Sequence, residues 1–121
     1  METPKEKILI TGALGQIGTE LTVRLSEIYG KENVIASGLD KWKEDITEAG
    51  YYERLDVTNF QAVTDVIKEH NITTVYHLAS LLSGTSEKQP LFAWKLNLDP
   101  LIHLCELAKA GTLKKIFWPS S

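Results

Sequence analysis

The stretch that decides the fold is "KILITGALGQIG", residues 7–18. Its first half is a short apolar run without alternation, which predicts a strand buried on both faces of a parallel sheet. Its second half carries three glycines in the spacing G-x-x-G-x-x-G. Apolar residues then recur at helical spacing from Ile17 to Ile28, and Gly30 follows as a helix end. The stretch therefore predicts a sharp turn from a buried strand into an amphipathic helix.

Each of the three glycines has its own physical reason. A strand that turns sharply into a helix demands unusual backbone angles, which suits Gly12. A pyrophosphate that approaches the main chain leaves no room for a Cβ at Gly15, and tight packing of the helix on the strand favours Gly18. Free N–H groups and the helix dipole would then hold the negative charge. A tight connection without any ligand is the alternative, but the strand before the loop and the helix after it favour nucleotide binding.

Strands and helices alternate along the rest of the chain. We expect further strands at 33–37, 51–55, 73–79 and 115–118, and helices at 60–70 and 90–110. Thr58 and Gln61 fit a capping box at the start of the first of these helices, and Pro100 predicts a kink in the second. The alternation predicts an α/β fold with βαβ crossovers, a doubly wound parallel sheet and helices on both faces. A fifth strand at the sheet edge would be exposed, which predicts marginal stability or self-association through residues 116–118.

Composition excludes several classes of protein. The net charge is −3 and no basic stripe is present, which argues against a nucleic-acid partner. No apolar run approaches the roughly 20 residues that span a bilayer, so we expect no membrane partner. Cys105 is the single cysteine, which excludes an internal disulfide and a cysteine-based zinc site and favours a reducing, cytoplasmic location. We expect no metal. The 121 residues allow one domain at most.

Four stretches of the chain carry a family resemblance: "ILITGALGQIGTEL", "LDVT", "VYHLASLLSGTSEKQPLFAWKLNLDPL" and "LKKIFWPSS". Together they resemble the extended short-chain dehydrogenase/reductase family of NAD-dependent epimerases and dehydratases, and within it the epimerase-like L-threonine 3-dehydrogenases. The resemblance implies a Rossmann-type domain, NAD as cofactor, and oxidation of L-threonine to 2-amino-3-ketobutyrate. It also implies a homodimer formed through helices that include residues 91–110. A nucleotide-sugar epimerase or dehydratase fragment and a non-catalytic dinucleotide-binding module are the alternatives.

The resemblance also assigns roles to individual residues. The expected substrate contacts are Ser83 and Thr85, and the expected catalytic hydroxyl is Ser121. The family's Tyr-x-x-x-Lys pair has no counterpart in these 121 residues. We therefore expect residues 1–121 to be an incomplete NAD-binding domain, truncated after the fifth strand, without a substrate domain and inactive alone. The expected cofactor-binding residues are Thr11, Gly12, Gly15, Gln16, Ile17, Gly18, Asp56, Val57, Leu78, Ala79, Ser80 and Asn97.

Two acidic positions leave alternatives open. The family usually places an Asp after the second strand to hold the adenosine ribose, and this position is Gly38 here. Asp40 either reaches the ribose through a shifted loop or is a surface acid. Asp56 either contacts adenine, which we favour, or caps the helix that follows. No arginine is expected beside the second strand to receive a 2′-phosphate, so NAD is favoured over NADP. His77 is expected to be a hydrogen-bonded core residue rather than an acid–base group.

Overall fold

Five parallel strands form one sheet in the order β3-β2-β1-β4-β5 in a computed structural model that describes residues 6–39, 51–79 and 90–119. Each neighbouring pair of strands is parallel. The elements in chain order are β1 (Ile8–Thr11), α1 (Gln16–Tyr29), η1 (Lys31–Asn33), β2 (Val34–Gly38), β3 (Tyr51–Arg54), α3 (Phe60–Glu69), β4 (Thr74–His77), α5 (Pro90–Lys109) and β5 (Lys115–Phe117). The expected α/β architecture is confirmed.

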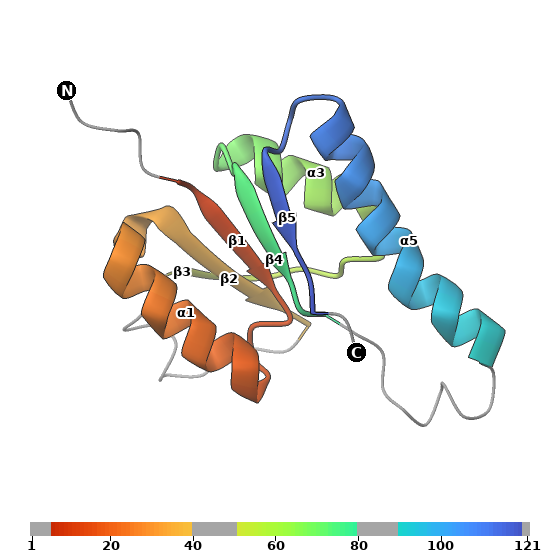
Figure 1. Ribbon diagram of the computed structural model, residues 1–121, viewed down its shortest axis with the longest axis horizontal. Helices are drawn as coiled ribbons and strands as arrows, with labels where there is room; N and C mark the ends of the chain where they lie inside the picture. The colour runs from red at the N-terminus through yellow and green to blue at the C-terminus, as the bar shows by residue number, and fades with distance from the viewer. Residues whose placement is uncertain (1–5, 40–50, 80–89, 120–121) are drawn as a thin grey trace.

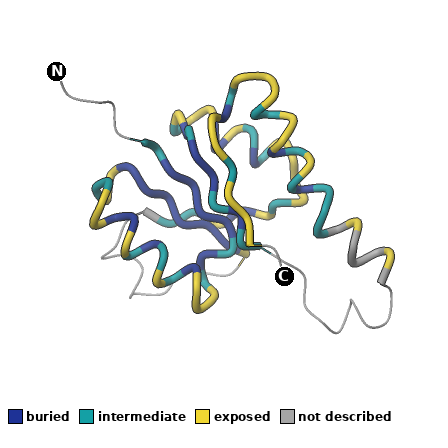
Figure 2. The backbone as a smooth tube through the Cα atoms, in the orientation of Figure 1, coloured by how far each residue is buried: buried dark blue, intermediate teal, exposed yellow. Residues whose placement is uncertain are grey.

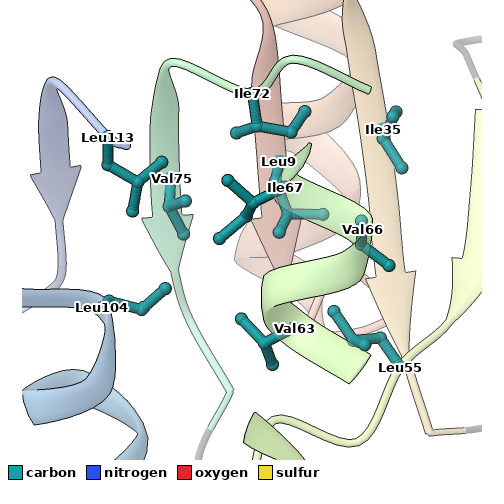
Figure 3. Packing of buried hydrophobic residues seen from close by; sticks show 10 residues of the cluster. All are labelled: Leu9, Ile35, Leu55, Val63, Val66, Ile67, Ile72, Val75, Leu104 and Leu113. Atoms are coloured by element: carbon teal, nitrogen blue, oxygen red, sulfur yellow. The ribbon is translucent and has the colours of Figure 1, made fainter. Parts of the chain in front are cut away.

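Helices cover both faces of the sheet, α1 on one and α3 with α5 on the other (Figure 1). Because side chains alternate along a strand, β1 supplies both cores. Ile8 and Ile10 pack with Val34 and Leu25 on the α1 face. Leu9 packs on the opposite face with Val75 and with Ile67 and its neighbours on α3, as Figure 3 shows. All four β1 residues are buried (Figure 2), which explains why the strand reads as an unbroken apolar run.

The start of α3 differs from the expected capping box. Asn59 caps the helix, with its side-chain oxygen accepting the N–H of Ala62 at 3.1 Å. The Thr58 hydroxyl instead donates to Asp56 Oδ1 at 2.6 Å. Thr58 therefore does not cap α3, because a nearer carboxylate takes its hydroxyl and the next residue fills the cap position.

The C-terminal third contains one long helix and the edge strand. Helix α5 continues through Pro100, whose ring cannot donate to the carbonyl four residues earlier. Strand β5 lies at the edge of the sheet, next to β4. Phe117 stacks on Tyr76 with ring centroids 4.8 Å apart, yet it is 46% exposed, and Trp118 is 53% exposed. The exposed edge strand is confirmed, and self-association through it stays a prediction.

Candidate functional site

The glycine loop joins β1 to α1 at the carboxyl ends of the strands, where ligands bind in open parallel sheets. The loop is tied to the strands on both sides. The N–H of Ala13 donates to the carbonyl of Ser37 in β2 at 2.9 Å. The N–H of Leu78, just beyond β4, donates to the carbonyl of Thr11 at 3.1 Å. These bonds fix the loop between the two neighbouring strands.

Gly12 and Gly18 are required by the fold itself. Gly12 has a φ of +67°, and a Cβ there would lie 2.6 Å from the backbone nitrogen of Ala79. A Cβ on Gly18 would lie 2.7 Å from both the Cα of Ala13 and the carbonyl oxygen of Gly12. The expected backbone angle at Gly12 is confirmed. The tight packing at Gly18 is confirmed, but its partner is the backbone of the glycine loop at Gly12 and Ala13 and not the strand that was expected.

Gly15 is different, because no atom of the described residues requires a glycine there. Its backbone is extended, with φ −72° and ψ 169°, and a Cβ would meet only the carbonyl oxygen of Gly12 at 3.7 Å. Gly15 is the N-cap of α1 and supplies no side-chain cap. The N–H groups of Gln16, Ile17 and Gly18 open the helix, where no earlier turn supplies carbonyls. The result is open space in front of uncapped donors at the positive end of a helix dipole, which suits an anion.

Thr11 holds the end of β4 against this loop. Its buried hydroxyl oxygen accepts the N–H of Ala79 at 3.2 Å and lies 2.8 Å from Nδ1 of His77. The same oxygen also accepts the N–H of Leu78 at 3.1 Å. Since two backbone N–H groups occupy its two lone pairs, its one hydrogen is left for Nδ1, so the ring carries its own proton on Nε2. Burial lowers the pKa of His77, in keeping with a neutral ring. His77 is thus a hydrogen-bonded core residue, as expected.

The ends of β2 and β3 form the other side of the site. A Cβ on Gly38 would lie 2.9 Å from the hydroxyl oxygen of Tyr52 and 3.3 Å from Cδ1 of Leu14. Arg54 is the register partner of Gly38, and its Nε donates to the carbonyl of Leu39 at 3.1 Å. The expectation that no arginine lies beside the second strand is therefore wrong, because β3 pairs with β2 and brings Arg54 to its end.

Residues 8–121 match the model of the NAD dependent epimerase/dehydratase family. The chain belongs to this family. An L-threonine dehydrogenase from Cupriavidus necator, described as GalE-like, has a similar structure, with 44% identity and a TM-score of 0.85 over 98% of this chain and 37% of that one. An L-threonine dehydrogenase from Clostridium difficile is 48% identical with a TM-score of 0.83 and the same coverage.

An uncharacterized epimerase/dehydratase of Staphylococcus haemolyticus is 46% identical over 96% of this chain and 36% of its own length. This chain therefore spans about a third of the length of its relatives, and it corresponds to their N-terminal portion. The UDP-glucose 4-epimerase of Thermotoga maritima, at 24% identity and a TM-score of 0.78, shows the shared fold alone.

Two of the remaining expected cofactor residues, Asp56 and Val57, lie on the turn that follows β3. Asp56 is exposed, and its Oδ1 accepts the N–H of Thr58 at 2.9 Å, which closes the turn after β3. It does not cap α3, and its contact with adenine stays a prediction. Val57 and Asn97 are partly buried, on the β3–α3 turn and on α5. Asp40, Ser80, Ser83, Thr85 and Ser121 lie outside the described residues.

Sequence reasoning missed two residues of this edge, Tyr52 and Arg54. The missing information was the register between β2 and β3, which places Arg54 opposite Gly38. Parallel strands end at a common edge, so the last residues of each predicted strand were the available signal.

Within residues 6–39, 51–79 and 90–119, no group of three or more His, Cys, Asp or Glu is placed to hold a metal ion. No helix in this part of the chain is long and apolar enough to cross a membrane.

Proposed function

We propose that this chain binds NAD through its glycine loop and serves as the cofactor-binding portion of an L-threonine 3-dehydrogenase-like oxidoreductase. The observation that carries the proposal is Gly15, a glycine that the packing of the described residues does not require. It stands in front of the uncapped first turn of α1. A dinucleotide pyrophosphate needs both features, a bare approach to the backbone and free N–H donors.

The chain's own residues would divide the work of holding the cofactor. The N–H groups of Gln16, Ile17 and Gly18 would donate to the pyrophosphate oxygens. Leu78 and Ala79, fixed by Thr11, would line the ribose and pyrophosphate. Asp56 and Val57 would contact adenine, and Asn97 would lie near the cofactor from α5. When bound, NAD supplies the hydride acceptor.

The substrate in this proposal is L-threonine. Its support is the 44% and 48% identity to L-threonine dehydrogenases, well above the 24% to a UDP-glucose 4-epimerase. In the complete enzyme Ser83 and Thr85 would contact threonine, and Ser121 would be the hydroxyl beside the Tyr-x-x-x-Lys pair. A homodimer and a cytoplasmic location complete the proposal. For the dimer, Ile102 on α5 is a large apolar side chain that is 43% exposed.

Calorimetric titration of the chain with NADH tests the cofactor half of this proposal. Saturable binding at one site per chain is the expected result, and a folded chain without any binding would contradict it. A chimera tests the substrate half. Residues 1–121 would replace the matching third of the Cupriavidus necator enzyme, and production of NADH from NAD and threonine would be followed. The chain alone should show no turnover. A folded chimera that binds NADH but leaves threonine unoxidised would favour a different substrate.

A further inference from the structure

Arg54 lies beside the end of β2, the place where Rossmann-type domains hold the adenosine ribose. It pairs with Gly38, the last residue of β2, and its Nε is held by the carbonyl of Leu39 at 3.1 Å. Alternate residues of a strand share a face, so Arg54 lies on the same face of β3 as Tyr52. A Cβ on Gly38 would point to the Tyr52 hydroxyl, 2.9 Å away. A side chain at position 38 would therefore lie on the same face of the sheet as Arg54, and Gly38 supplies none there.

Among the described residues, the charges at the end of β2 favour an added phosphate. An acid after the second strand binds the ribose hydroxyls, and its negative charge would repel a 2′-phosphate, whereas Gly38 has no side chain. Arg54 is exposed, and no carboxylate among the described residues forms an ion pair with it. The nearby Asp56 turns its Oδ1 to the N–H and hydroxyl of Thr58. Since Nε anchors the guanidinium, its terminal nitrogens can present a fork of N–H donors, the geometry that phosphate prefers.

We propose that Arg54 forms a subsite for the 2′-phosphate of an NADP-type dinucleotide, so that the chain accepts NADP(H) as well as NAD(H). This inference rests on the proposed function, because the glycine loop must first hold the pyrophosphate. Arg54 is then the residue that decides specificity at the ribose end, and the absence of an acid at Gly38 is what permits it to act.

Calorimetric titrations with NADH and NADPH at low salt test the proposal. In the unaltered chain the two dissociation constants should agree within about threefold, or NADPH should bind more tightly. Arg54→Met should weaken NADPH at least tenfold and NADH less than twofold. Salt should weaken NADPH more steeply than NADH, because it screens the additional charge pair. The matched control is Arg24→Met, which removes the chain's other arginine, an exposed α1 residue beside Glu27, and should change neither affinity.

A gain of discrimination provides the second test. Gly38→Asp combined with Tyr52→Phe restores an acid and removes the oxygen that its Cβ would meet. This double variant should weaken NADPH at least tenfold relative to Tyr52→Phe alone and retain NADH. The proposal is overturned if the unaltered chain binds NADPH more than tenfold more weakly than NADH, or if Arg54→Met weakens both equally. That first ratio needs no variant, so it remains decisive if Arg54→Met does not fold. Failure of both dinucleotides to bind would instead contradict the proposed function.

Discussion

Helices α1 and α3 both follow the carboxyl end of a strand, but their first turns are built differently. Helix α3 begins at a residue whose side chain caps it, Asn59, which accepts the N–H of Ala62. Helix α1 begins at Gly15, which offers no side chain, and the helix keeps its first donors uncapped. The protein caps one helix start with its own side chain and leaves the other uncapped, and there we propose that the pyrophosphate binds. The difference separates residues that the fold needs from residues that a bound anion needs.

The largest effect is expected where the fold needs glycine. Gly12→Ala places a Cβ 2.6 Å from the backbone of Ala79 at a φ of +67°. The backbone angle costs about 1–2 kcal/mol and the overpacking about 1–3 kcal/mol more, and urea denaturation would measure the loss. Gly111→Ala is the matched control, because Gly111 has a φ of +87° with no atom within 4 Å of its Cβ. Equal losses in the two variants would show that the contact with Ala79 adds nothing.

The second largest loss of stability is expected at Thr11, whose hydroxyl joins β1 to the end of β4. Thr11→Val leaves the N–H of Ala79 and Nδ1 of His77 without their partner and should cost about 1–3 kcal/mol in urea denaturation. The control is Thr22→Val, at an equally buried hydroxyl that only donates back to the carbonyl of Gly18 in its own helix. The account of the strand ends would fail if Thr11→Val were no more destabilising than Thr22→Val.

The neutral His77 ring predicts that the free energy of unfolding depends on pH. Burial lowers the pKa of His77 below its ordinary value of about 6.5, so the unfolded chain takes up the proton first as the pH falls. Its contribution to stability is complete above about pH 6.5 and is lost as the pH falls toward the folded pKa, at no more than about 1.4 kcal/mol per pH unit. His77→Asn keeps an acceptor for Thr11 and does not titrate. Its denaturation midpoints should fall less steeply below pH 6.5, and an unchanged pH profile would argue against the neutral ring.

Capping at α3 gives a smaller effect and sharpens the comparison with α1. Asn59→Ala removes the acceptor of the Ala62 N–H and should lower the free energy of unfolding by about 1 kcal/mol. Thr58→Ala removes a hydroxyl that bonds the exposed Asp56 and should cost less. Thermal or urea denaturation of both variants would measure the difference. A larger loss for Thr58→Ala would restore the capping box expected from the sequence.

The sequence was sufficient for features that depend on neighbouring residues. The apolar run before Gly12 predicts a doubly buried strand, and the glycine itself predicts an unusual backbone angle, because both follow from burial and local sterics. Contacts between strands could not be predicted from the sequence in the same way. Thr11 and His77 are 66 residues apart, and no local pattern joins them.

The same limit explains the error at Arg54. Its place beside Gly38 depends on the pairing of β2 with β3, a tertiary property that periodicity does not encode. The prediction of the α3 cap was wrong for a different reason. Thr58 and Asn59 could each cap the helix, and the Asp56 carboxylate binds the Thr58 hydroxyl, which leaves Asn59 as the cap. The sequence therefore predicted the glycine loop and the fold, but not the polar contacts between residues that the sheet brings together from distant parts of the chain.

The proposed function depends most directly on Gly15 serving a ligand and not the fold. Gly15→Ser gives α1 the side-chain cap that it lacks, so the free energy of unfolding should stay the same or rise by a few tenths of a kcal/mol. The same change should weaken NADH binding at least tenfold, because the new side chain occupies the approach of the pyrophosphate. Denaturation and NADH titration of this one variant measure both quantities. Stability retained with affinity lost is the predicted result, and unchanged affinity for NADH would contradict it.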